Sequence, residues 1–192
     1  MTTASTPKGE RRRQALVEAA AELLIEGGFD ALRHRAVAER AGLPLASTTY
    51  YFQSLDELVM AALEYHGRAE LAKGYELLDS LAERPPETLV ELVLDQLLGP
   101  PAPDGDFEAV LLRYERLVAT GRRPYLRPLM LELGGELRKL LLATFAAMGV
   151  PIDADRLEQL IALVDGAVVN ALIEVDPDPR ENARRMLRRA LG

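Results

Sequence analysis

Apolar residues recur every three to four positions through nearly the whole chain, and this spacing is what most constrains its fold. Residues with that period share one face of an α-helix, as Leu16, Ala20, Leu23 and Leu24 do in the first segment. The sustained alternation and Asn-Gly turns that mark strands and hairpins are missing, and aromatic residues make up only 5%. The sequence therefore predicts an all-α protein with about nine or ten helices.

Glycine, proline and capping residues set the expected helix boundaries. Gly27 and Gly28 are expected to stop the first helix, and Ser54 with Glu57 forms a capping box that starts a long helix at Leu55. Shorter helices are expected around 37–41 and over 45–51, and further ones at about 86–98, 106–120, 124–148, 154–175 and 179–191. The expected parts are a flexible tail over 1–8, a three-helix domain over 9–54, a connecting helix over 55–84 and a larger helical domain over 85–192.

Composition excludes several classes of protein. The 192 residues are 48% apolar and 28% charged, which is typical of a globular domain. Cysteine is absent and there are two histidines, so we expect no disulfide, no metal site and no other cofactor. No nucleophile–base pair and no Gly-rich phosphate loop stands out, so we expect no enzyme.

Neither a secretory signal nor a membrane span is visible. The segment MTTASTPKGERRRQ has no apolar core, and no apolar run reaches the ~18–20 residues that cross a bilayer. The net charge is −7, yet residues 1–51 carry seven lysines or arginines against six acidic residues. The N-terminal part is therefore less acidic than the rest of the chain. This uneven charge fits an N-terminal part that faces an anion, and it fits ordinary scatter equally well. We expect a cytoplasmic protein that does not enter a membrane.

Residues 32–51, LRHRAVAERAGLPLASTTYY, have the spacing of a helix-turn-helix. Ala38 is small enough for close packing of two helices, and Gly42, four residues later, permits a left-handed turn. The outward residues of the second helix are Ala46, Ser47, Thr49 and Tyr50. Their hydroxyl and methyl groups suit a DNA major groove. The spacing alone fits an ordinary helical hairpin equally well.

The flanking sequence separates these two interpretations. RRQALVEAAAELLIEG (12–27) and GFDALRHRAVAERAGLPLASTTYYFQSLDEL (28–58) resemble the DNA-binding domain of TetR-family transcriptional regulators. The resemblance covers about residues 9–66, with the Gly-Phe, Val-Ala, Ala-Gly-Leu and Tyr-Tyr-Phe steps in order. The second half resembles the family's ligand-binding and dimerisation domain only in architecture.

The resemblance implies which residues contact DNA. The expected set is Arg35, Ala46, Ser47, Thr49, Tyr50 and Tyr51, within the helix-turn-helix span Leu32 to Tyr51. Thr49 and the two tyrosines are expected on bases or backbone, and Arg35 on a phosphate. Arg11, Arg12 and Arg13 are expected to form a mobile basic arm on DNA, or else a solvated tail.

The chain departs from the family pattern at several positions. Arg33 stands where a capping Thr or Ser is common, and Pro44 where Ser often precedes the recognition helix. Thr48 replaces a common aliphatic core residue. Thr49 and Tyr51 stand where DNA-contacting Tyr and His are common. The operator sequence therefore cannot be carried over from a relative.

The helices at about 124–148 and 154–175 are expected to form a four-helix interface with a second copy, or else a core within one chain. Residues 160–175 are apolar nearly all round, and small residues repeat along one side. The expected dimer interface consists of Leu133, Leu137, Leu141, Ala162, Gly166, Val169, Asn170 and Ile173.

An effector pocket is expected among the body helices because they offer many apolar and few polar side chains. Its expected lining is Leu63, His66, Val110, Tyr114 and Met130. Such a pocket favours an apolar or amphipathic small molecule. The helix that starts at Leu55 is expected to be the only element that transmits motion between head and body, and Gly67 and Gly74 to let it bend.

These features predict a nucleoid-associated homodimeric regulator that binds a near-palindromic operator in double-stranded DNA. We expect a repressor that a small molecule releases from DNA. The alternative is a helical interaction or scaffold protein that has lost operator binding. A mobility-shift assay on the DNA upstream of its own gene distinguishes the two.

Overall fold

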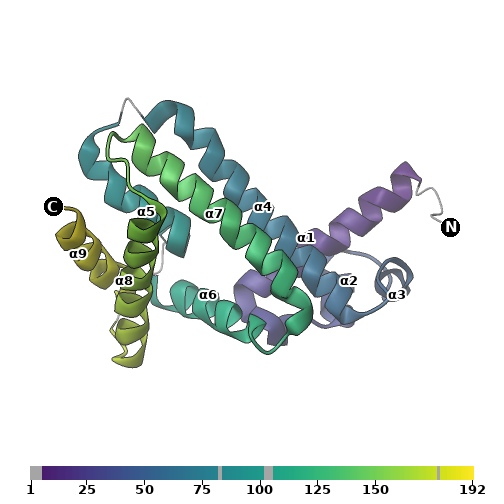
Figure 1. Ribbon diagram of the computed structural model, residues 1–192. Helices are drawn as coiled ribbons and strands as arrows, with labels where there is room; N and C mark the ends of the chain where they lie inside the picture. The colour runs from purple at the N-terminus through teal and green to yellow at the C-terminus, as the bar shows by residue number, and fades with distance from the viewer. Residues whose placement is uncertain (1–5, 82–83, 102–105, 177) are drawn as a thin grey trace. The chain divides into compact units, whose positions relative to one another are not determined.

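A computed structural model describes residues 6–81, 84–101, 106–176 and 178–192. Over these ranges the chain is helical and contains no strand, as predicted. The helices of the first half are α1 (Pro7–Ala31), α2 (His34–Arg40), α3 (Ala46–Tyr51), α4 (Leu55–Leu81) and α5 (Leu89–Leu98). Those of the second half are α6 (Asp106–Thr120), α7 (Arg127–Ala147), α8 (Ala154–Ile173) and α9 (Pro179–Leu191) (Figure 1).

Proline shapes two of the helix starts. Short 3₁₀ turns, Pro86–Thr88 and Pro124–Leu126, precede α5 and α7, so the α-helices begin about three residues later than predicted. Proline is tolerated in a first turn because the amide it lacks would have no intrahelical partner there.

The expected break at Gly27 and Gly28 is present, although the helix resumes after it. Both glycines leave the helical region, with φ of −146° and +63°, and one further turn closes α1 at Ala31. At the other end, α1 begins earlier than predicted. Of the expected tail over 1–8, residues 1–5 lie outside the described residues, whereas Thr6 caps a helix that already includes Pro7 and Lys8.

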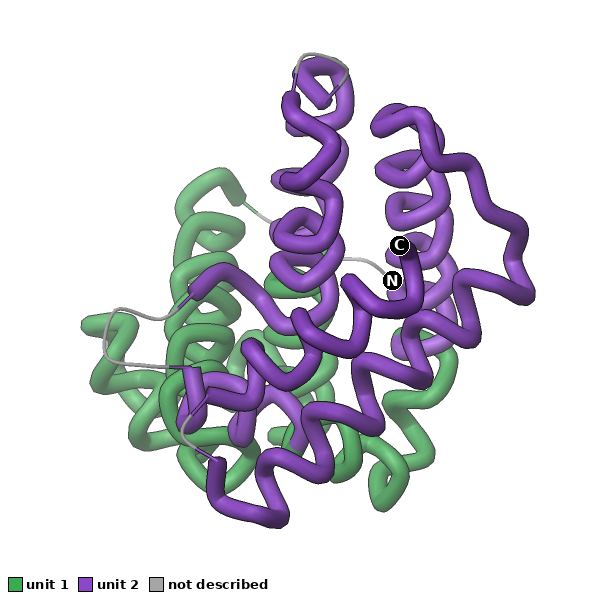
Figure 2. Tube along the Cα trace, turned by 90° about the vertical axis from the view of Figure 1, so that its left-hand side faces the viewer, with its two compact units in different colours: residues 1–68, 115–129 green, residues 69–114, 130–192 purple. Residues whose placement is uncertain are grey.

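The chain forms two compact units (Figure 2). The first unit contains residues 1–68 and 115–129, and the second contains residues 69–114 and 130–192. Helices α4, α6 and α7 each contribute to both units. The expected division placed all of 85–192 in one domain, but the structure groups the C-terminal end of α6 and the start of α7 with the N-terminal helices.

Side-chain contacts within the first unit explain this grouping. Arg116 is only 9% exposed, and its guanidinium lies 3.5 Å from the carbonyl of Leu24. The Arg123 guanidinium lies 3.9 Å from the centre of the Phe29 ring, a cation–π contact. Both arginines therefore anchor the α6–α7 segment to α1.

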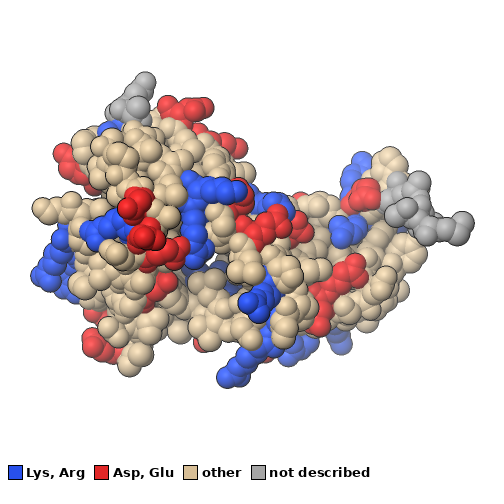
Figure 3. All heavy atoms as spheres, in the orientation of Figure 1, with Lys and Arg blue, Asp and Glu red and all other residues tan. Residues whose placement is uncertain are grey.

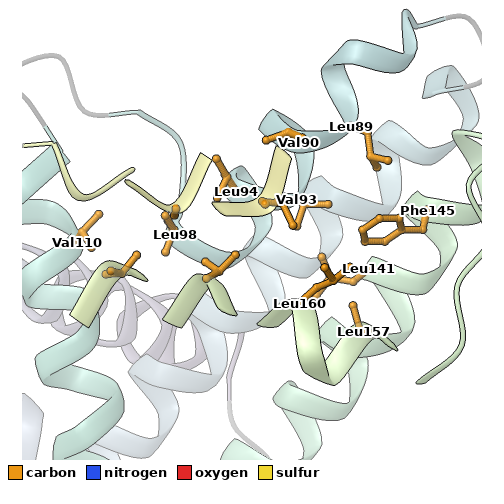
Figure 4. Close-up of a cluster of buried hydrophobic side chains, with 14 of the residues drawn as sticks. Leu89, Val90, Val93, Leu94, Leu98, Val110, Leu141, Phe145, Leu157 and Leu160 are labelled. Atoms are coloured by element: carbon orange, nitrogen blue, oxygen red, sulfur yellow. The ribbon is translucent and has the colours of Figure 1, made fainter. Parts of the chain in front are cut away.

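The core of the second unit is built by α5, α7, α8 and α9 together with the first part of α6. Leu94, Leu141, Phe145, Val164 and Val168 are fully buried in it (Figure 4). Among the described residues, no helix is long and apolar enough to cross a membrane.

Candidate DNA-binding site

The turn between α2 and α3 has the geometry that its sequence predicted. Gly42 has a φ of +63°, which favours glycine over every residue with a side chain. The amide of Leu43 donates to the carbonyl of Ala38 at 2.9 Å and closes the turn. Ala38 is 2% exposed, as expected for a small residue between two packed helices.

One side of α3 is buried in the first unit. Thr48 is fully buried, and its hydroxyl donates to the carbonyl of Leu45 at 2.8 Å. This bond removes the cost of placing a hydroxyl where the family often has an aliphatic side chain. Phe52, at the C-terminal end of α3, is 1% exposed. The orientation of α3 is therefore fixed by packing.

The opposite side of α3 faces solvent. Ala46, Thr49 and Tyr50 are exposed, whereas Ser47 and Tyr51 are half-buried. Tyr50 is 80% exposed, and its ring meets the ring of Tyr51 edge to face with centres 4.8 Å apart. The structure thus brings the expected contact residues of α3 together on one short helix.

Arg35 has a partner that the sequence did not predict. It is highly exposed on α2, and its Nε donates to Glu39 Oε1 at 2.9 Å. This hydrogen bond raises the pKa of Arg35. A phosphate that binds Arg35 would therefore compete with a carboxylate of the same helix.

Arg11, Arg12 and Arg13 do not form an arm in front of the first helix, so that expectation is corrected. They lie within α1, because the Thr6 cap and Pro7 start the helix before them and arginine is a good helix former. Arg11 and Arg12 are exposed. Arg13 is half-buried, with its guanidinium 5.0 Å from the centre of the Phe52 ring. Arg13 therefore supports the end of α3.

Arg40 holds α2 against α1. It donates to Glu22 at 3.1 Å and to Glu26 at 2.7 Å, and its hydrogen bond lowers the pKa of Glu26. Sequence reasoning missed this clamp because its partners are 14 and 18 residues away. It also missed Leu45, an apolar residue that is 52% exposed directly before α3. The one sequence feature that could have indicated the exposure of Leu45 is its position beside the turn.

Charged side chains of both signs lie on the surface of the protein. On the face of the molecule drawn in Figure 3, Lys and Arg side chains alternate with Asp and Glu side chains. Although the net charge is −7, the acidic side chains do not form one continuous patch on that face.

The expected interface residues fall into three groups. Ala162, Gly166, Val169, Asn170 and Ile173 are all exposed on α8. Leu133 and Leu137 are half-buried on α7. Leu141 is a correction, because it is fully buried in the core of its own chain and is not available to a second copy.

A hollow of about 520 Å³ runs along the exposed stripe of α8 and extends to α9. Ala162, Gly166 and Asn170 line it together with Arg185 and Arg189. Sequence analysis missed the contribution of α9.

The residues of the expected effector pocket are divided between the units. Leu63 and His66 belong to the first unit, and Val110, Tyr114 and Met130 to the second. None of them lines the hollow on α8 or the second hollow, of about 470 Å³, between α5 and the end of α9. The hydroxyl of Tyr114 donates to Asp165 at 2.7 Å, and burial together with this bond raises its pKa.

Known families match both parts of this architecture. The family described as "Bacterial regulatory proteins, tetR family" matches residues 16–62. The family described as "Tetracyclin repressor-like, C-terminal domain" matches residues 84–192.

Individual relatives agree with these matches. The multidrug binding protein EbrR in complex with ethidium is 34% identical, with a TM-score of 0.67, over 94% of this chain and 99% of that one. A TetR-family member from Streptomyces coelicolor A3 is 32% identical, with a TM-score of 0.60, over 94% of this chain and 98% of that one.

The HTH-type transcriptional repressor KstR of Rhodococcus jostii (strain RHA1) is 32% identical over 92 residues, or 46% of this chain. The match spans only 40% of the length of KstR. With two family matches that together cover most of the helical chain, the protein belongs to the TetR family of bacterial regulatory proteins.

Proposed function

We propose that this protein is a transcriptional repressor that binds operator DNA through α3 and is released by a small amphipathic molecule. The observation that carries the proposal is the exposed side of α3, where Ala46, Thr49 and Tyr50 project from a helix fixed by Thr48 and Phe52. A short, rigid helix with exposed hydroxyls and methyls fits a major groove. KstR is named as a repressor, which supports the sign of the regulation.

Each residue then has a role. Tyr50 places its ring on sugar and its hydroxyl on phosphate, which fixes the protein on any sequence. Thr49 and Ser47 present hydroxyls to base edges, and Ala46 presents a methyl group to thymine. Arg35 binds a phosphate after exchanging Glu39 for it. Arg11 and Arg12 add positive charge from the first turns of α1.

The active form is a homodimer that forms through α8 and α9. Val169 is 41% exposed and Ile173 is 73% exposed on α8, next to the small residues Ala162 and Gly166. Apolar side chains at such exposure are stabilised when a second copy covers them. A two-fold dimer presents two copies of α3, so the operator is near-palindromic with half-sites about one helical turn apart or more. The protein then acts in the cytoplasm, on nucleoid DNA.

The effector is an apolar or amphipathic molecule. Structures of EbrR are complexes with ethidium, proflavin and malachite green, each an organic molecule with aromatic rings. The second unit of this chain is rich in buried leucine and valine, which suits a molecule with a large apolar part.

A mobility-shift assay with the DNA upstream of the protein's own gene tests operator binding. Tyr50→Ala with Tyr51→Ala is expected to weaken binding at least tenfold, whereas Tyr75→Ala, an exposed tyrosine of α4 in the second unit, leaves it unchanged. Wild-type affinity is expected to fall steeply with salt, because phosphate contacts release counterions. Binding that ignores both salt and the double substitution would favour the scaffold alternative.

A further inference from the structure

Two buried polar atoms in the second unit lack a hydrogen-bond partner within the described part of the chain. Gln96 Oε1, on α5, is an acceptor, and Arg113 Nε, on α6, is a donor. Unpartnered buried polar atoms are rare in folded proteins because water is lost without replacement, so each one calls for an explanation.

The bonds that these side chains do form fix how they lie. Thr144 donates its hydroxyl proton to the carbonyl of Leu140 at 3.0 Å, so its oxygen accepts from Gln96 Nε2 at 2.8 Å. This leaves Gln96 Oε1 as the free end of the amide. Arg113 uses its terminal nitrogens, Nη1 towards Glu70 at 3.1 Å and Nη2 towards the Gln96 carbonyl at 3.5 Å. A free donor and a free acceptor thus belong to one cluster, yet they do not satisfy each other.

The surroundings of this cluster are apolar. Val93 precedes Gln96 by three residues, Val110 precedes Arg113 by three, and Leu141 precedes Thr144 by three, so each lies on the same helix face as its polar neighbour. All three are at most 2% exposed and belong to the core in Figure 4. The charge of Arg113 is already matched by Glu70. A further net charge would remain uncompensated there, which disfavours an ionic ligand.

We propose that Gln96 and Arg113 form the polar end of the effector site, and that the effector is an uncharged amphipathic molecule with a donor beside an acceptor, as in a carboxamide. The donor binds Gln96 Oε1, the acceptor takes the Arg113 Nε proton, and the apolar body lies against the core. This inference rests on the proposed function.

The position of the cluster also suits regulation. Glu70, Arg113 and Thr144 lie on α4, α6 and α7, the three helices that contribute to both units. A molecule bound at Gln96 and Arg113 therefore acts on helices that continue into the unit with the helix-turn-helix.

A matched pair of neutral probes tests the inference. 2-Naphthamide carries both a donor and an acceptor, whereas N,N-dimethyl-2-naphthamide keeps the acceptor and lacks the donor. By isothermal titration we expect the wild type to bind 2-naphthamide at least tenfold more tightly than the dimethyl compound. Gln96→Leu is expected to abolish this difference, and Gln159→Leu, an exposed glutamine of α8, to preserve it. Arg113→Lys, which keeps the charge and removes Nε, is expected to weaken 2-naphthamide at least fivefold and gives a second variant if Gln96→Leu does not fold.

The outcomes separate this inference from the proposed function. Equal binding of both probes, no binding of 2-naphthamide, or discrimination that survives in Gln96→Leu overturns the site and indicates that water alone satisfies these atoms. Operator binding of the wild type and of Gln96→Leu without probe is measured in parallel. If the wild type does not bind the operator, the proposed function as a regulator is rejected, whatever the result with the two probes.

Discussion

Three glycines in this chain have different physical roles, one in a turn and two within helices. Gly42 must adopt a left-handed backbone. Gly74, on α4, has an ordinary helical backbone, but a Cβ there would collide with the side chain of Leu140 on α7. Gly166 meets nothing within 4 Å in its own chain. We expected Gly74 to let α4 bend. The structure instead gives it a role in the close packing of α4 against α7.

Gly74→Ala is expected to lower the free energy of unfolding by ~1–3 kcal/mol, because the new Cβ would collide with the side chain of Leu140, which is 1% exposed and would have to shift within the core. Gly135→Ala, in α7, is the control. It meets no atom within 4 Å, so it is expected to be neutral or stabilising by up to ~1 kcal/mol. Urea denaturation at one fixed protein concentration measures both. A neutral Gly74→Ala would show that α4 and α7 separate easily.

Glu39→Gln is expected to raise the affinity for DNA of any sequence by roughly 3–10-fold, since ~1.4 kcal/mol corresponds to tenfold. The change frees Arg35 from its hydrogen bond and removes a negative charge near the phosphates. Glu76→Gln, an exposed acidic residue of α4 in the second unit, makes the same change in net charge and is expected to have little effect. Fluorescence anisotropy with operator and unrelated DNA checks this, and equal gains from both variants would assign the effect to net charge alone.

At the scale of elements, the start of a helix was predicted best where a capping side chain marks it, as for α4. Ser54 accepts from the amide of Glu57 at 3.1 Å, as the capping box indicated, and Asp153 accepts from the amide of Arg156 at 2.7 Å in the same way at the start of α8. These signals succeed because a cap and its partner lie within one turn. The exposure of Ala46, Thr49 and Tyr50 on α3 was predicted from the spacing of the helix-turn-helix, whereas Ser47, expected to face outward, is half-buried.

The placement of α9 was not predictable in this way. Arg180 is 2% exposed and binds Asp95 at 3.1 Å and Asp106 at 3.0 Å, residues that lie 85 and 74 positions earlier. Sequence periodicity shows that α9 has a polar face, but not which carboxylates meet it. The contacts of Gln96 and Arg113 were missed for the same reason.

Glu91 makes the anchoring of α9 dependent on pH. It accepts two hydrogen bonds from Arg184, at 2.6 Å and 3.0 Å, and these lower the pKa of Glu91. A carboxyl whose pKa is lower in the folded than in the unfolded chain stabilises the fold above the ordinary value of ~4.3, and this contribution is lost as the pH falls through the folded value.

Glu91→Gln is therefore expected to destabilise the protein at pH 7 by up to ~1 kcal/mol, because the pair is partly exposed. The difference from the wild type is expected to shrink below pH ~4.3 and to vanish once the carboxyl is protonated. Glu87→Gln, an exposed residue of the preceding turn, is the control. Thermal unfolding between pH 3 and 8 measures the effect, and a deficit that is constant with pH would contradict it.

At the scale of the whole molecule, three helices rather than one are shared by the two units. The sequence predicted α4 as the only connection because its length and caps are visible locally. The place of the α6–α7 segment in the first unit depends on Arg116 of α6 and on Arg123 after it, which bind a carbonyl and a ring of α1. An amphipathic pattern shows that a helix is covered but does not identify what covers it. The same limit placed Leu141 in the expected interface rather than in the core.

The last prediction concerns assembly, where Gly166 separates folding from dimerisation. A Leu side chain at this position has open space within its own chain, so Gly166→Leu is expected to leave the thermal stability of the isolated chain nearly unchanged. In a dimer that forms through α8, the same side chain keeps the two helices apart, and the dissociation constant is expected to rise at least tenfold, or ~1.4 kcal/mol. Ala72→Leu, an exposed small residue of α4, is the control.

Sedimentation velocity at micromolar concentration is expected to show a dimer for the wild type and for Ala72→Leu, and a monomer–dimer mixture for Gly166→Leu. Operator titrations should follow the same order, because a monomer reads only one half-site and loses the second set of contacts. A wild-type monomer would exclude the α8 interface directly. If Gly166→Leu leaves the dissociation constant of the dimer unchanged, the interface does not lie on α8. The exposed Val169 and Ile173 would then need another partner.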